Sequence, residues 1–138
     1  MRELSIALGG NTMSPQPFKA KAYLKEGCPF SFKYLLFMVE AGLSDQIEVI
    51  RCDPSDPEFD AVKAKLAAGL RKPASFPTVE IEPGRYESDS DALIRNYATK
   101  NGVEASSLPA LAFYTETIFP QILDLHEQKS DAETRQNR

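Results

Sequence analysis

The chain has 138 residues, enough for one domain of ordinary size, and 42% of them are hydrophobic, which supplies apolar surface for a core. Its formal net charge of -4, with both signs interspersed, leaves no basic stripe that could hold nucleic acid. No apolar run approaches the roughly 18 residues of a membrane span. We therefore expect a cytoplasmic protein with neither a nucleic-acid nor a membrane partner.

Hydrophobic spacing predicts alternating strands and helices in the middle of the chain. The first segment alternates apolar residues with lysine, as a half-exposed strand does, and a dense apolar run of helical length follows it. Later, apolar residues recur at helical spacing, and a Pro83-Gly84 turn separates two strand-like runs. In chain order we expect a strand at 18–24, a helix at 30–41, a strand at 47–50, a helix at 59–70, a hairpin at 78–87 and a helix at 90–101.

This order, β-α-β-α-β-β-α, predicts one α/β domain over 18–102, with a four-stranded mixed sheet flanked by helices. Residues 1–17 combine a short apolar patch with glycines and prolines, and we interpret them as an N-terminal extension with room for an extra edge strand. Residues 103–126 predict one amphipathic C-terminal helix with a kink at Pro120. Residues 127–138 are nearly all polar, which predicts a disordered, solvated tail.

Cys28 stands directly after a predicted strand and turn and directly before a helix, in the run Cys28-Pro29-Phe30-Ser31. Free N–H groups and the helix dipole favour a thiolate there, and helix-start cysteines have pKa values of about 3.5–7.5 against about 8.5 unperturbed. Ser31 occupies the place of a second, resolving cysteine, so any redox cycle needs an external thiol. The alternative is that Cys28 only packs at the helix cap.

The other cysteine, Cys52, ends the second predicted strand and is interpreted as structural. Two cysteines are too few for a disulfide framework and lack the companion ligands of a zinc site. We therefore expect both thiols to be reduced and no metal to be bound.

Three segments resemble the motifs of one known group of proteins. The run at 28–31 resembles the active-site start of glutaredoxins and of omega-type, cysteine-using glutathione transferases. Residues 76–79, Phe-Pro-Thr-Val, resemble the segment in which thioredoxin-like proteins place a cis-proline before the third strand. Residues 89–94, Asp-Ser-Asp-Ala-Leu-Ile, resemble the motif that opens the third helix of glutathione transferase N-terminal domains. The resemblance covers about 18–102 and implies a thioredoxin-like fold.

The resemblance also implies a role for each motif, with Cys28 as the nucleophile and Ser31 beside it. The backbone of Phe76, held by a cis peptide to Pro77, would pair with the cysteinyl part of glutathione. Ser90 and the N–H groups of its helix start would hold the γ-glutamyl carboxylate, and Asp89 the α-ammonium. The remaining implied contacts are Pro29, Phe30 and, for the glycyl carboxylate, Lys72 or Arg71.

Three of these implied residues also have a plainer interpretation. Ser90 would be an ordinary helix N-cap, Pro77 a strand-initiating proline and Lys72 a solvated charge. The chain also departs from a full glutathione transferase, because only about 36 residues follow Gly102. That length holds one helix, so we expect the pocket for a hydrophobic co-substrate to be mostly missing.

Cys28, with serine in the place of a resolving cysteine, and the resemblance together favour a glutathione-dependent monothiol thiol-disulfide oxidoreductase, or thioltransferase. Glutathione would be its co-substrate, and glutathionylated proteins or small disulfides its partners. One alternative is a non-catalytic, glutathione transferase-like module that binds a partner or forms a homodimer through the C-terminal helix. A lesser alternative is a glutathione-assisted iron–sulfur carrier, which Pro29 disfavours because such carriers usually have glycine at that position.

Overall fold

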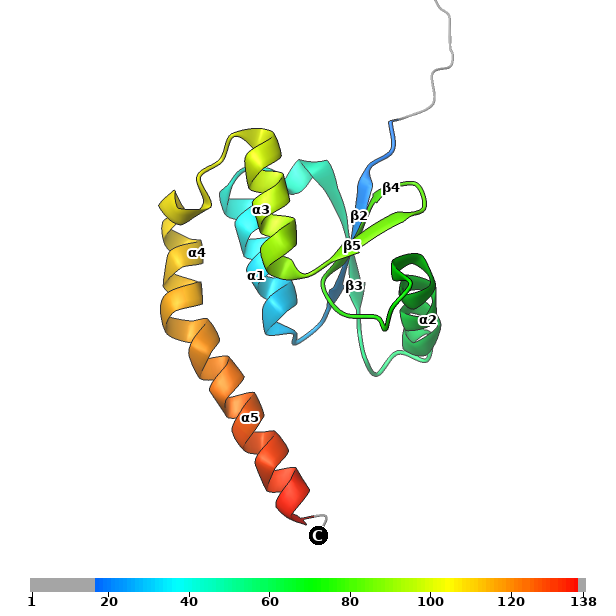
Figure 1. Ribbon diagram of the computed structural model, residues 1–138, viewed down its shortest axis with the longest axis vertical. Helices are drawn as coiled ribbons and strands as arrows, with labels where there is room; N and C mark the ends of the chain where they lie inside the picture. The colour runs from blue at the N-terminus through cyan, green and yellow to red at the C-terminus, as the bar shows by residue number, and fades with distance from the viewer. Residues whose placement is uncertain (1–16, 137–138) are drawn as a thin grey trace, which may run out of the picture.

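The computed structural model describes residues 17–136 (Figure 1), so all but the last residue of the predicted N-terminal extension lies outside the described residues. The predicted β-α-β-α-β-β-α order is confirmed. The elements are β2 (Ala20–Lys25), α1 (Pro29–Glu40), β3 (Ile47–Cys52), α2 (Phe59–Leu70), β4 (Thr78–Glu82), β5 (Arg85–Ser88), α3 (Ser90–Asn101), α4 (Pro109–Phe113) and α5 (Phe119–Gln136), with short 3₁₀ turns at Ser44–Gln46 and Ala105–Ser107.

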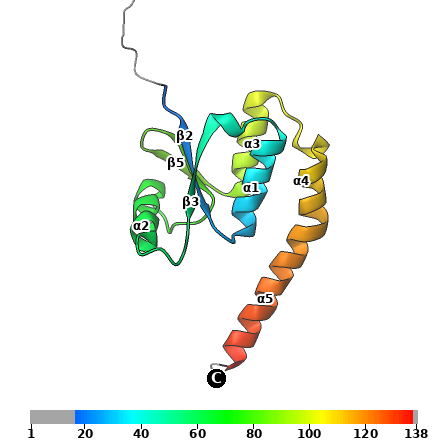
Figure 2. The same cartoon turned by 180° about the vertical axis from the view of Figure 1, so that it is seen from behind.

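The four strands form one mixed sheet in the order β3-β2-β4-β5. β2 runs parallel to β3, with Ala20 opposite Ile47, and antiparallel to β4, with Ala22 opposite Val79. β4 and β5 form the predicted antiparallel hairpin. Helices α1 and α3 cover one face of the sheet and α2 covers the other (Figures 1 and 2). This arrangement confirms the predicted α/β class.

Strand β2 is central and almost fully buried, so its prediction as a half-exposed strand is wrong. Ala22 and Leu24 belong to the large core cluster on the α1–α3 face, whereas Tyr23 packs with Leu66 and Cys52 on the α2 face. The lysines that suggested exposure lie at the rim of the strand, where Lys21 is half-buried and Lys25 is exposed. A strand flanked by strands on both sides and helices on both faces is buried whatever its alternation indicates.

Helix α2 approaches the sheet closely through Gly69. A side-chain carbon at this position would come within 2.3 Å of the Tyr86 ring on β5. Glycine inside a helix costs stability relative to alanine, but only glycine leaves space for this contact. The close approach helps to fix the position of α2 against β5.

The C-terminal helical segment differs from its prediction in two ways. Its irregularity is a π-helical turn, Tyr114–Ile118, which lies before Pro120 rather than at it. Because proline has no N–H and its ring clashes with the carbonyl four residues earlier, the preceding turn cannot keep the regular hydrogen-bond pattern. The deviation therefore falls in the turn that Pro120 disturbs.

The second difference is the length of α5, which continues to Gln136, past residue 127 where the disordered tail was predicted to begin. The sequence from 127 to 136 is rich in glutamate, glutamine, lysine, alanine and arginine, all good helix formers. Gln128 also donates a hydrogen bond to the Asp124 carboxylate one turn earlier, at 2.9 Å. Polarity thus predicted exposure here and not the backbone conformation. Across residues 17–136, none of the helices combines the length and the apolar character needed to cross a membrane.

Candidate active site

Cys28 is the N-cap residue of α1, as the sequence predicts. Gly27, with a φ of +79°, turns the chain at the end of β2, and the Cys28 N–H donates to the Lys25 carbonyl at 3.2 Å. The Cys28 sulfur accepts a hydrogen bond from the Ser31 N–H at 3.5 Å. The sulfur therefore lies at the end of the helix where free N–H groups stabilise negative charge.

The proline loop lies against the cysteine and has the predicted cis peptide between Phe76 and Pro77. The Cys28 thiol lies 3.8 Å from the Phe76 carbonyl, within hydrogen-bonding range for sulfur. Pro77 is fully buried, and the Phe76 ring stacks on Phe59 of α2 at a centroid distance of 5.8 Å. The backbone of the residue before the proline thus faces the sulfur.

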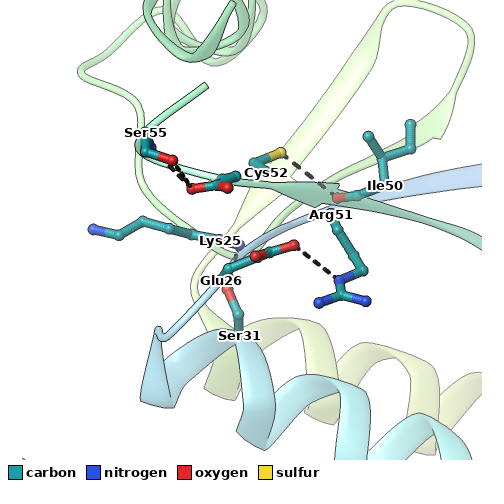
Figure 3. A network of polar contacts seen from close by, with 8 residues as sticks. Lys25, Glu26, Ser31, Ile50, Arg51, Cys52 and Ser55 are labelled. Carbon is teal, nitrogen blue, oxygen red and sulfur yellow. Dashed lines mark hydrogen bonds and ion pairs between the residues drawn. The ribbon is translucent and has the colours of Figure 1, made fainter. Parts of the chain in front are cut away.

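Ser31 contacts the cysteine through its backbone and not through its hydroxyl. The hydroxyl oxygen accepts a hydrogen bond from the Lys25 N–H at 3.1 Å, which joins the end of β2 to the first turn of α1 (Figure 3). The side chain is only 3% exposed. Ser31 therefore holds the loop that carries Cys28, while its N–H stabilises the sulfur.

Cys52 lies in the α2-side core cluster and donates from its thiol to the Ile50 carbonyl at 3.6 Å (Figure 3). Burial, and secondarily the charge of Glu26, raise the pKa of the Cys52 thiol. A raised pKa keeps the thiol protonated and a poor nucleophile. The Glu26 charge is itself paired with Arg51 at 3.0 Å. These features agree with the structural role predicted for Cys52.

At the start of α3, Asp89 and not Ser90 is the N-cap. Asp89 has a φ of +81°, and its carboxylate accepts a hydrogen bond from the Asp91 N–H at 3.1 Å. Ser90 is the first helical residue and is 4% exposed. The interpretation of Ser90 as an ordinary N-cap is therefore wrong, because the preceding aspartate satisfies the helix start. The glutathione contacts of both residues stay a prediction.

Two cavities flank Cys28. The smaller, of about 220 Å³, lies between the cysteine and the proline loop, and we call it the proline-loop cavity; its lining is Lys25, Cys28, Phe59, Lys63, Ala74, Ser75 and Phe76. The larger, of about 650 Å³, lies toward the C-terminal helices, and we call it the helix cavity; its lining includes Cys28, Pro29, Phe32, Leu35, Val49, Tyr114, Ile118 and Ile122. Both therefore open beside the same sulfur.

The helix cavity was not expected from the sequence. One helix after Gly102 seemed too short to build an apolar pocket, yet Tyr114, Ile118 and Ile122 supply its outer wall. The π-helical turn contributes two of these three residues, Tyr114 and Ile118. Their apolar spacing was the available signal, but nothing in the sequence indicated that they would face the cysteine.

The basic residues beside Cys28 are not those that the resemblance implied. Lys72 is exposed after the end of α2, and Arg71 is its left-handed C-cap with a φ of 60°. Neither lines a cavity that contains Cys28, whereas Lys25 and Lys63 line the proline-loop cavity. Lys63 follows Phe59 by one helical turn, so its position on the same face of α2 was a signal that the sequence offered.

Phe30 and Lys33 join α1 to the C-terminal helix. Phe30 packs edge-to-face against Phe119 with a centroid distance of 5.2 Å. Lys33 is buried, and its ammonium group lies 4.6 Å from the Phe119 ring centroid and 2.7 Å from the Asp91 carboxylate of α3. This contact links three helices near the start of α1, and it places Phe30 against α5.

Within residues 17–136, no three His, Cys, Asp or Glu side chains gather closely enough to hold a metal ion.

A single cysteine at the N-terminus of α1, a cis-proline before β4 and the strand order β3-β2-β4-β5 together define a thioredoxin-like domain with a one-cysteine site. No protein-family model matches the chain, and no curated protein matches it. Two solved structures are similar at low identity. The first, a possible glutathione S-transferase from Rhodopseudomonas palustris, is 21% identical with a TM-score of 0.48, over 78% of this chain and 56% of that one.

The second is glutathione transferase Omega 2C from Trametes versicolor, which is 17% identical with a TM-score of 0.43. The similarity covers 77% of this chain and 45% of that one. The chain thus spans about half the length of each of these two proteins.

Proposed function

We propose that this protein is a glutathione-dependent monothiol thioltransferase, with Cys28 as its nucleophile. The observation that supports this function best is the position of the Cys28 sulfur, 3.5 Å from the Ser31 N–H and 3.8 Å from the Phe76 carbonyl beside the cis-proline. The N–H groups at a helix N-terminus stabilise negative charge that develops on the sulfur, and the loop offers backbone groups to a peptide-like thiol.

The reaction has two displacement steps. The Cys28 thiolate attacks the glutathione sulfur of a mixed disulfide, so a bond forms between the two sulfurs while the substrate thiolate leaves with the electron pair of the broken bond. A second glutathione thiolate then attacks the glutathionyl sulfur on Cys28, which forms glutathione disulfide and releases the Cys28 thiolate. Ser31 has no thiol that could replace this second glutathione.

We assign glutathione to the proline-loop cavity and the leaving thiol to the helix cavity. The backbone of Phe76 would pair with the cysteinyl part, as the resemblance implies. Asp89 and Ser90 do not line this cavity, so they would bind the γ-glutamyl end where it extends out of it. Lys63 and Lys25 are better candidates than Lys72 for the glycyl carboxylate because they line this cavity. The apolar walls of the helix cavity favour an apolar leaving thiol.

The test is glutathione-dependent reduction of a small glutathionyl mixed disulfide by the wild type, Cys28→Ser and Cys52→Ala. We expect Cys28→Ser to lose at least about 100-fold in rate, since serine lacks a comparably nucleophilic anion at neutral pH. Cys52→Ala should keep most of the wild-type rate, because Cys52 is buried and lines neither cavity. Equal rates for the wild type and Cys28→Ser would refute the proposal.

A second candidate is the non-catalytic binding or dimerisation module. It is favoured by large apolar side chains that are exposed on the C-terminal helices, including Phe113 at 63% and Leu125 at 64%. A protein of this kind would show no glutathione binding by titration calorimetry and a concentration-dependent dimer by sedimentation. Glutathione binding together with a monomer would exclude it.

A further inference from the structure

Tyr114 joins the C-terminal helices to the first turn of α1. It is the first residue of the π-helical turn, and its side chain is only 4% exposed. Its ring packs edge-to-face on Phe32 of α1, at a centroid distance of 4.9 Å, and against Phe119 of α5 at 5.6 Å. Both rings hold the phenol in one orientation.

The Tyr114 hydroxyl donates a hydrogen bond of 2.8 Å to the Pro29 carbonyl, which is 85 residues earlier in the chain. Pro29 immediately follows Cys28 and is the first residue of α1. The hydrogen bond therefore fixes the carbonyl of the residue that directly follows Cys28. The adjacent Ser31 N–H, in turn, contacts the sulfur at 3.5 Å.

The phenol remains a donor over a wide pH range. Burial, and secondarily the charge of Cys28, raise the pKa of Tyr114. The influence of Cys28 agrees with the position of both residues on the wall of the helix cavity. A buried phenol that stays protonated keeps its hydrogen bond to the Pro29 carbonyl as the pH rises.

We propose that Tyr114 is a positioning residue for Cys28. The Tyr114 hydroxyl holds the first turn of α1 so that the Ser31 N–H stays directed at the sulfur. This inference rests on the proposed role of Cys28 as nucleophile. It explains why a helix outside the sheet domain reaches back to the active-site turn. It also couples the reactivity of Cys28 to the docking of α4 and α5.

The test uses alkylation of Cys28 by iodoacetamide between about pH 5 and pH 9, in a Cys52→Ala background so that one thiol reports. Tyr114→Phe removes only the hydroxyl and keeps the ring contacts. We expect its alkylation rate at neutral pH to fall about three- to tenfold and the midpoint of the pH profile to move upward, as the loss of one hydrogen bond predicts. Tyr97→Phe, which alters a buried tyrosine of α3, should leave the profile unchanged.

An unchanged profile for Tyr114→Phe would overturn the inference. So would a uniform change in rate at every pH, because it would indicate altered access to the sulfur and not altered ionisation. The readout does not require glutathione. If Cys28→Ser keeps thioltransferase activity while Tyr114→Phe shifts the alkylation profile, the proposed function fails and the positioning role stands.

Discussion

The two cavities beside Cys28 differ in size and in the segments that line them. The proline-loop cavity is small, lies within the sheet domain and has Lys25 and Lys63 in its wall. The helix cavity is about three times larger and mainly apolar, although Lys25, Glu26 and Arg51 also line it, and Tyr114, Ile118 and Ile122 of the C-terminal helices complete it. The Cys28 sulfur therefore lies between the proline-loop cavity, which the sheet domain forms, and the mainly apolar helix cavity, which the C-terminal helices complete. Under the proposed function, the first cavity would bind glutathione and the second would hold the thiol that leaves.

The largest effect should come from weakening the attachment of the C-terminal helices to α1 at Glu40. Its carboxylate accepts hydrogen bonds from the N–H groups of Ala110 and Leu111, at 2.7 and 2.8 Å, and so caps α4, whose own N-cap Leu108 has no side-chain acceptor. We expect Glu40→Ala to destabilise the docked C-terminal helices by about 2 kcal/mol, through loss of a charge-assisted cap. Amide hydrogen exchange would report faster exchange in 109–122 than in the wild type.

The same measurement contains its own control. Protection in β2 and β4 should change little in Glu40→Ala, because the cap lies outside the sheet core. Glu40→Gln keeps one acceptor oxygen without the charge, so its exchange in 109–122 should be faster than in the wild type and slower than in Glu40→Ala. Equal loss of protection in the helices and in the sheet would contradict the separation of the two sides.

A charge in the helix cavity should change the choice of leaving thiol. Ile122 lines this cavity, whereas Leu125, on the same helix, is 64% exposed and does not line it. We expect Ile122→Glu to lower kcat/KM about fivefold for a mixed disulfide with an apolar thiol, because burying a carboxylate there is unfavourable. A hydrophilic mixed disulfide should react almost as before.

Leu125→Glu is the matched variant for this experiment and should leave both rates near those of the wild type. If Ile122→Glu slowed the reactions of both substrates equally, the helix cavity would not distinguish leaving thiols. The assignment of glutathione to one cavity and the leaving thiol to the other would then fail.

A smaller effect is expected on the other side of the sulfur. Lys63 lines the proline-loop cavity and its ammonium group lies 5.7 Å from the Phe59 ring centroid, whereas Lys72 lines neither cavity beside Cys28. We expect Lys63→Met to raise the KM for glutathione about threefold with little change in kcat, as the loss of one solvent-accessible charge contact predicts. Lys72→Met should have no effect, and the reverse result would restore Lys72 as the glycyl contact.

These two sides also differ in how well the sequence predicted them. The sheet domain was predictable because its signals are local: Cys28 before an apolar helix, Pro77 before a strand run and a Pro83-Gly84 turn between two strands each fix the nearby backbone. The cis peptide was implied by the resemblance of one short segment, 76–79. The N-cap at Asp89 was missed because a serine and an aspartate in succession compete for one cap position.

The helix side was not predictable because its determinants are contacts distant in sequence. Glu40 caps α4 from 70 residues away, and Tyr114 reaches Pro29 across 85 residues. Hydrophobic periodicity predicts that a helix has an apolar face, but it does not state which surface that face covers. The same limit applies to Lys63, whose neighbours depend on how α2 crosses the sheet.

The smallest expected effect distinguishes the two sides by pH. Burial raises the pKa of the Cys52 thiol, in the α2-side core next to the proline-loop cavity, and of the Tyr114 phenol in the helix cavity. Each group is neutral in both states below its unfolded pKa, so the stability it contributes is fully present there. That stability is lost as the pH rises toward the folded value, because only the unfolded chain then gains the charge.

The unfolded values are about 8.5 for cysteine and about 10 for tyrosine, so the two losses begin in separate windows. We expect Cys52→Ala to flatten the alkaline fall in unfolding free energy from about pH 8.5, and Tyr114→Phe only from about pH 10, by a few tenths of a kcal/mol per pH unit each. Urea titrations at intervals of pH measure both slopes. If Cys52→Ala left the slope from about pH 8.5 unchanged, burial of Cys52 would contribute nothing to the pH dependence.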